Sequence, residues 1–322
     1  MRIAPRNWVL GGVFAVLLAF SLREPGSSAG LGQREITRLF PDFRAEDAAY
    51  VVMEGSPSPS DTDPTSTEAT KVRIELRRRA AEGEAEPWIL PAHFDHPANT
   101  VSVEQLFNAL SSLTNLDLLS EDPGRHGDYG VGDSGLTVRV LDASDELIAG
   151  FVQGANASTG AGMASYIRSL GGDGVYRAPR VGPIPLQPRY WLERRWTSFK
   201  PVRVRKLEIR KGTEVAEWSR SDMERWDSDD RPVSARRVRD FLERLALLFL
   251  DEAVAAEVDG RSADLVISIE MVDGTRETLS FARPNDEGER EAWLNGEGRV
   301  VRFAASTSAS LDGWIRELEE RK

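Results

Sequence analysis

Residues 101–113, VSVEQLFNALSSL, and residues 233–245, VSARRVRDFLERL, are two copies of one helical pattern about 130 residues apart. In both copies apolar residues recur at spacings of four and three, which places them on one face of a helix. The anchors of this face are Leu106, Leu110 and Leu113 in the first copy and Val238, Leu242 and Leu245 in the second. Ser102 and Ser234 stand where an N-cap is expected, and Ser102 with Gln105 fits a capping box. The pattern predicts one amphipathic helix per copy.

The segments on either side of the two helices also correspond. A pair of apolar strands ending near a tryptophan, Trp88 or Trp226, precedes each helix. Alternating strands follow, and residues 136–140, LTVRV, match residues 265–269, LVISI. Such alternation, bounded by turns, is typical of β-hairpins. The sequence therefore predicts an α+β protein with two tandem β-β-α-β-β-β-β modules, each with one helix on a mostly antiparallel sheet.

Composition along the chain places the expected boundaries. We expect residues 45–182 to form the first repeat and residues 191–322 the second, which ends in an amphipathic helix. Residues 55–70 are rich in Ser, Pro, Thr and Asp, and predict a disordered insertion in the first repeat. The proline-rich residues 183–190 are the predicted linker.

An apolar segment lies near the N-terminus. Residues 7–22 carry no charge and are flanked by Arg6 and Arg23. Residues 1–23 therefore predict a transmembrane anchor, and residues 24–44 a juxtamembrane linker. A cleaved signal peptide, which needs a shorter apolar region, is the alternative. Either interpretation puts the two repeats outside the cytoplasm, and the anchor predicts a single-pass protein of the bacterial inner membrane.

Bulk composition limits the classes of function. The formal net charge of −11 argues against a general nucleic-acid surface, which would need positive potential. The absence of cysteine excludes disulfides, thiolate metal sites and cysteine nucleophiles. With 40% apolar residues, a chain of 322 residues can fill two hydrophobic cores.

Several motifs that resemble chemical sites occur in unsuitable contexts. Residues 26–30 match the nucleophile elbow G-x-S-x-G but fall in a linker, and residues 130–135 match G-x-G-x-x-G but precede a strand. His93, Asp95 and His96 could ligate zinc, yet no predicted helix fixes them, so we expect a polar loop. The sequence thus predicts no catalytic residue, no cofactor and no resident metal.

Two further features have alternative interpretations. Trp88 and Trp226 could stack on carbohydrate, but their matched positions beside core strands favour buried anchors. The basic residues between 194 and 206 alternate in part with valines, as on the solvated face of a strand. A specific anionic partner is the alternative for that segment.

Four stretches resemble a bacterial family named domain of unknown function 4340. These stretches are residues 88–90 (WIL), 96–99 (HPAN), 129–131 (YGV) and 189–199. The family usually has Tyr-Pro-Ala-Asp in the second stretch, so His96 and Asn99 depart from its pattern. Its members often have an N-terminal membrane segment and a repeated module, and commonly accompany components of gliding-motility-type ABC transporters. The resemblance therefore implies an auxiliary role in the envelope, with other envelope proteins as partners.

Two function hypotheses follow. The first is a non-enzymatic, membrane-anchored accessory subunit of an ABC-type export or gliding-like transport system. The second is an independent periplasmic module that binds a cell-envelope polymer or a small ligand, with the groove between the repeats as a plausible site. A hydrolase is a third possibility, but no acid–base pair lies in a suitable context.

Overall fold

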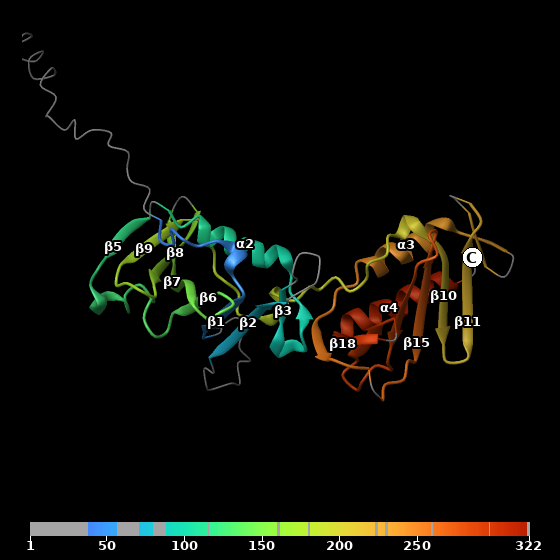
Figure 1. Cartoon of the computed structure of the whole chain (residues 1–322). Coiled ribbons are helices and arrows are strands. Elements are labelled where there is room, and N and C mark those ends of the chain that lie inside the picture. The colour runs from blue at the N-terminus through green and yellow to red at the C-terminus, as the bar shows by residue number, and fades with distance from the viewer. Residues whose placement is uncertain are drawn as a thin grey trace, which may run out of the picture.

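The computed structural model describes residues 38–56, 71–79, 88–114, 116–159, 162–179, 181–222, 225–228, 231–258, 260–295 and 297–320. These residues form two antiparallel sheets of nine strands each (Figure 1). The expected anchor at residues 1–23 lies outside the described residues, as do most of the expected linker 24–44 and most of the insertion 55–70. Within the described ranges, no helix has the length and apolar character needed to span a membrane.

The first sheet has the strand order β4-β3-β2-β1-β6-β7-β8-β9-β5. Its strands are β1 (Tyr50–Gly55), β2 (Val72–Arg78), β3 (Trp88–Leu90), β4 (His96–Pro97), β5 (Asp117–Ser120), β6 (Leu136–Leu141), β7 (Leu147–Thr159), β8 (Gly162–Ser169) and β9 (Val175–Pro179). Helix α2 (Thr100–Ser111) packs on one face of this sheet, and the two together are called the first module. Short 3-10 helices lie at η1 (Ala45–Asp47), η2 (Pro91–His93) and η3 (Pro123–Arg125).

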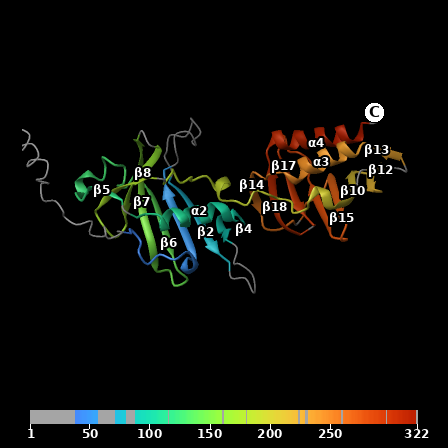
Figure 2. The same ribbon diagram turned by 90° about the horizontal axis from the view of Figure 1, so that it is seen from above.

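The second sheet has the equivalent order β13-β12-β11-β10-β15-β16-β17-β18-β14. Its strands are β10 (Val204–Lys211), β11 (Glu214–Arg220), β12 (Trp226–Ser228), β13 (Arg231–Val233), β14 (Glu252–Ala255), β15 (Leu265–Met271), β16 (Arg276–Phe281), β17 (Arg290–Leu294) and β18 (Glu297–Phe303). Helices α3 (Ala235–Ala246) and α4 (Ala305–Glu319) cover one face (Figure 2) and complete the second module. The connection to the first module carries η4 (Pro188–Tyr190) and η5 (Pro201–Arg203).

The expected class of mostly antiparallel sheets with few helices is confirmed, but the predicted unit β-β-α-β-β-β-β is wrong in its strand count. Four strands precede the helix in each module and five follow it. The missed strands are two to four residues long, and they are β3, β4, β5, β12, β13 and β14. A strand that short shows no measurable alternation, so its sequence gives no period-two signal.

Alternating burial explains how each sheet contributes one face to the hydrophobic core, which runs as one cluster through both modules and the connection between them. In β6, Val138 and Val140 are fully buried, and Ile267 and Ile269 are their counterparts in β15. The register is equivalent as well, because β1 pairs with β6 as β10 pairs with β15. A slip of one residue would turn these side chains to the opposite face, so burial fixes the register.

All eight repeat anchors lie in the core, each at most 7% exposed. They are Trp88, Leu106, Leu110, Leu113, Trp226, Val238, Leu242 and Leu245. Trp88 packs edge-on against Phe107 of α2, with ring centroids 5.5 Å apart. Both matched tryptophans therefore lie inside the modules, where no carbohydrate could stack on them.

The predicted N-cap at Ser102 is wrong, because the N-cap of α2 lies three residues earlier. Asn99 is the N-cap, and its Oδ1 accepts a hydrogen bond from Ser102 N at 3.0 Å. Asn caps as well as Ser, and Asn99 lies two residues after the end of β4, where the backbone is still extended. The Ser102 hydroxyl instead donates to the Tyr190 carbonyl. Ser234 does occupy the N-cap of α3, without a side-chain hydrogen bond.

Truncating Leu242 should destabilise the second module. Leu242 is 1% exposed in α3, so Leu242→Ala removes buried methyl groups and leaves a cavity. We expect a loss of about 2–5 kcal/mol in the free energy of unfolding, measured by denaturant titration. Leu247→Ala is the matched control, since Leu247 is 59% exposed at the end of the same helix and should change stability little. Equal losses for the two variants would contradict the packing described.

Candidate functional site

The chain between the two sheets hydrogen-bonds first to the first module. Asn99 N donates to the Trp191 carbonyl at 2.7 Å, and Glu193 N donates to the Pro97 carbonyl at 2.8 Å. These bonds flank an antiparallel bridge between Ala98 and Leu192. Residues 97–99, which lead into α2, are thereby paired with residues 191–193 of the connection.

The next residues of the connection, Arg194 and Arg195, pair with the second module. Leu250 N donates to the Arg194 carbonyl at 3.0 Å, and Arg194 Nε donates back to the Leu250 carbonyl at 2.8 Å. Arg195 forms an antiparallel bridge with Phe249. Residues 191–195, called the junction segment below, therefore pass from the backbone of one module to that of the other without a gap.

A buried polar cluster holds the start of the linker on the first sheet. Gln153 is 5% exposed, and its Nε2 donates to Ser165 Oγ at 2.9 Å and to the Gly182 carbonyl at 2.8 Å. Its Oε1 accepts a hydrogen bond from Ile184 N. Ser165 Oγ donates to the Val181 carbonyl at 2.8 Å. Since buried amides and hydroxyls are costly unless bonded, this cluster fixes the path of the predicted linker.

A buried carboxylate holds the other end of the connection. Glu277 of β16 is 3% exposed, and its carboxylate accepts hydrogen bonds from Ser198 N at 3.1 Å and Ser198 Oγ at 2.8 Å. Trp196 is buried nearby and packs edge-on against Phe281 and Phe303. The whole connection is thus bonded or buried at successive points.

The three weak metal candidates do not form one centre. His96 is buried, and its Nε2 lies 3.0 Å from the Glu193 carbonyl, to which it must donate because a carbonyl only accepts. Asp95 pairs with Arg77 at 3.7 Å, and His93 lies near Glu252 of β14. Across the described residues, no group of three or more His, Asp or Glu is placed to hold a metal ion.

Residues 93–96 instead contact the second module. Arg299 Nε of β18 donates to the Phe94 carbonyl at 3.3 Å. The β14–β18 end of the second sheet faces this turn (Figure 2), and β14 contacts η2. Phe94 and Asp95 have left-handed backbones, with φ of 58° and 54°, and this tight turn directs neighbouring side chains to different partners. The turn is therefore a second contact between the modules.

The G-x-G-x-x-G stretch at residues 130–135 is a turn that closes the outer face of the first sheet. Val131 is fully buried and packs with Val152 and Val175. Gly130 has φ of +67°, a conformation that suits glycine. Ala155 N donates to the Tyr129 carbonyl at 3.1 Å, which brings the turn onto β7. The stretch has a structural role and does not open a helix.

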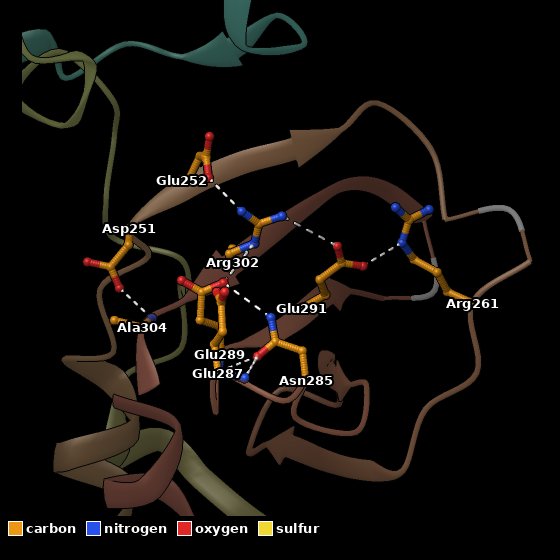
Figure 3. Close-up of polar contacts among 9 residues, drawn as sticks. All are labelled: Asp251, Glu252, Arg261, Asn285, Glu287, Glu289, Glu291, Arg302 and Ala304. Atoms are coloured by element: carbon orange, nitrogen blue, oxygen red, sulfur yellow. Dashed lines mark hydrogen bonds and ion pairs between the residues drawn. The ribbon is translucent and has the colours of Figure 1, made fainter. Parts of the chain in front are cut away.

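Sequence reasoning missed a charged network on the outer face of the second sheet, the face opposite α3 and α4. Figure 3 shows Arg302 at its centre, with ion-pair distances of 3.0 Å to Glu252, 3.7 Å to Glu289 and 3.9 Å to Glu291. Arg261 also binds Glu291, at 3.0 Å. Exposed pairs of this kind contribute roughly 0–1 kcal/mol each, so the network orients connections more than it stabilises the fold.

An open hollow of about 540 Å³ lies on the same outer face. Its lining includes Arg210, Arg276, Thr278, Ser280, Trp293 and Asn295. Trp293 follows Glu291 on β17 and pairs with Ser280 of β16, so the hollow borders the charged network. Trp293 and Ser280 are almost fully buried and form its floor. No local sequence signal could have found it, because its residues come from separate strands.

One family model, described as a domain of unknown function (DUF4340), matches residues 88–264. The match begins at β3 and ends just before β15, so it includes the junction segment and parts of both sheets. Two of the family-like stretches, residues 96–99 and 189–199, pair directly with each other at the junction. No curated protein and no solved structure matches the chain.

Gly154→Ala should destabilise the first module. A Cβ at this position would lie 2.1 Å from the Tyr129 carbonyl oxygen and 2.8 Å from the Gly130 carbonyl carbon, both backbone atoms. We expect a loss of about 1–3 kcal/mol in the free energy of unfolding, because the turn must move away from β7. Gly132→Ala is the control within the same turn, since nothing lies within 4 Å of its added Cβ. A Gly154→Ala variant as stable as the control would refute the close approach.

Acidification should destabilise the fold through the junction histidines. Burial lowers the pKa of His93 and of His96 below 6.5, and protonating His96 would place a proton on Nδ1, which is buried without a partner in the described chain. At acidic pH the unfolded chain therefore binds more protons at these histidines than the folded chain does. Their contribution lowers the free energy of unfolding as the pH drops below about 6.5, and it is constant at higher pH.

This effect is measured by urea titration at about pH 7.5 and at about pH 5.5, where carboxylates remain ionised. His96→Gln retains a donor for the Glu193 carbonyl but does not titrate, and should reduce the difference between the two pH values. Ser102→Ala, which removes a hydrogen bond to the Tyr190 carbonyl but no titrating group, should leave the difference unchanged. An undiminished pH dependence in His96→Gln would contradict this assignment.

Proposed function

The chain belongs to the DUF4340 family, and from this premise we propose that it is a non-enzymatic accessory subunit of an ABC-type export or gliding-like transport system. The resemblance described above supports the choice of partner. The proposal places the two modules outside the cytoplasm at the bacterial inner membrane, with other envelope proteins as partners and no nucleic acid. The uncharged residues 7–22 support a single-pass tether.

The observation that carries this proposal is the bonding of the junction segment to both modules. Trp191 and Glu193 bond to residues of the first module, and Arg194 bonds to Leu250 of the second. A linker bonded in this way holds two sheets at a fixed spacing, which suits a subunit that must engage a multi-subunit partner at two places. A freely jointed connection would not hold the two sheets at a fixed spacing.

A role without catalysis is supported by how the ionisable side chains are used. Each carboxylate of the Arg302 network pairs with a guanidinium, and Glu277 binds the connection through Ser198. His93, Asp95 and His96 contact separate partners. We accordingly propose no catalytic residue, cofactor or metal.

The free edge of the first sheet is the surface we propose for docking. Strand β5 is the terminal strand of its sheet, and its outer edge pairs with no other described strand, so it suits recognition by strand addition. Its equivalent in the second sheet, β14, contacts η2 of the first module. Leu118 in β5 is 48% exposed, so the edge also presents an apolar side chain.

A photo-crosslinking amino acid at position 118 should capture permease or ATPase subunits of an ABC transporter in living cells. Position 147 provides the matched control, because Leu147 is 47% exposed at the start of β7, away from the sheet edge. Mass spectrometry of the membrane fraction identifies the crosslinked peptides. Capture of transporter subunits from neither position, or equally from both, would count against docking at β5.

The tether is tested separately by replacing residues 8–22 with a cleavable signal sequence. If the anchor contributes to assembly, this change should abolish complex formation while denaturant titration shows that the modules remain folded. Retained complex formation would count against the anchored subunit.

The second candidate is an independent binding module for a cell-envelope polymer or small ligand. The hollow on the second sheet favours it, since its volume of about 540 Å³ lies in the usual range for ligand sites. The purified chain should then cosediment with cell-wall material in the absence of any membrane partner. Its failure to cosediment with both peptidoglycan and polysaccharide would eliminate this function.

A further inference from the structure

The outer faces of the two sheets differ at one equivalent place. In the first module, residues 121–135 connect β5 to β6 and bring Val131 down onto Val152. In the second module the equivalent connection, residues 256–264, is shorter. The registers of the two modules make Ser280 the counterpart of Val152. An apolar contact in one module is thus replaced by a polar residue at the floor of a hollow in the other.

The hollow holds an excess of hydrogen-bond donors. Asn295 Oδ1 accepts from Thr278 N at 2.8 Å, which leaves its amide NH₂ group to donate. Within the described chain, the hydroxyls of Thr278 and Ser280 and the indole N–H of Trp293 make no hydrogen bond to another residue. Groups of this kind require a partner, either solvent or a ligand.

The charge of the hollow is positive, although the chain as a whole has a net charge of −11. Arg210 forms no ion pair with any residue that the structure describes, and no described Asp or Glu lines the hollow. Arg276 has one long pair, 3.8 Å to Glu270, and Glu270 is already bonded to Arg205. Two guanidinium groups are therefore able to receive a carboxylate in a bidentate manner.

We propose that this hollow binds an acidic sugar, a pyranose unit with a carboxylate, as part of an envelope polysaccharide. The carboxylate binds Arg210 and Arg276. The ring hydroxyls bond to Thr278, Ser280, Asn295 and the indole N–H of Trp293. An open, polar hollow suits a saccharide better than an apolar ligand, which would require enclosure. This inference deepens the second candidate function and is independent of docking at β5.

The test is isothermal titration calorimetry of the full chain with trigalacturonate, using neutral galactotriose as the comparison. Trigalacturonate should bind, and the neutral trisaccharide should bind at least about tenfold more weakly because it lacks the charged contacts. The double variant Arg210→Gln/Arg276→Gln should lose at least about tenfold in affinity for trigalacturonate. Both side chains are exposed, so the fold should tolerate the change.

Arg239→Gln removes one positive charge from α3, on the opposite face of the sheet, and should leave the affinity unchanged. The proposal is overturned by any of three results: no binding of trigalacturonate, equal binding of the neutral sugar, or complete displacement by inorganic phosphate, which would indicate a site for any anion. Cosedimentation with cell-wall material without trigalacturonate binding would retain the second candidate function and reject this ligand.

Discussion

Backbone pairing of the junction segment with both modules is the interaction on which the arrangement of the molecule depends. Leu192 bridges to Ala98 of the first module, and Arg195 bridges to Phe249 of the second. Leaving buried amides and carbonyls without hydrogen-bond partners raises the free energy of the folded chain. Detaching the segment from either module is therefore unfavourable. The same pairing directs the β14–β18 end of the second sheet toward the turn at Phe94.

Repetition gives the two modules one strand order, while their outer faces differ. In each module a helix, α2 or α3, packs its apolar face on alternating strand residues, and α4 adds to this layer in the second module. On the opposite faces, Val131 seals the first sheet, whereas the second sheet has a charged network and an open hollow. A duplicated fold can keep its core for stability in both copies and still use one exposed face for binding. This division explains how one outer face can be sealed by an apolar contact while the other carries a hollow.

The sequence predicted the features that depend on local periodicity and missed those that depend on distant residues. Leu106, Leu110 and their counterparts could be identified because helical spacing exposes a buried face directly. The capping residue was misplaced because Asn99 and Ser102 both suit an N-cap, and only the end of β4 decides between them. The residues of the Arg302 network come from β14, β17, β18 and two connecting segments. No contiguous sequence pattern could therefore predict it. For His93, Asp95 and His96 the sequence favoured a polar loop over a zinc centre, and it gave no sign that a left-handed turn would direct them to separate partners.

The fixed spacing of the modules is tested most directly by pulsed electron paramagnetic resonance with one spin label on each module. The chain has no cysteine, so Leu147→Cys and Val272→Cys provide two unique attachment points, both exposed. Pairing of the junction segment predicts a single narrow distribution of distances between the labels. It also predicts that the distribution broadens when Gly-Gly-Ser is inserted between Leu192 and Glu193. A broad distribution in the chain without the insertion would contradict the account.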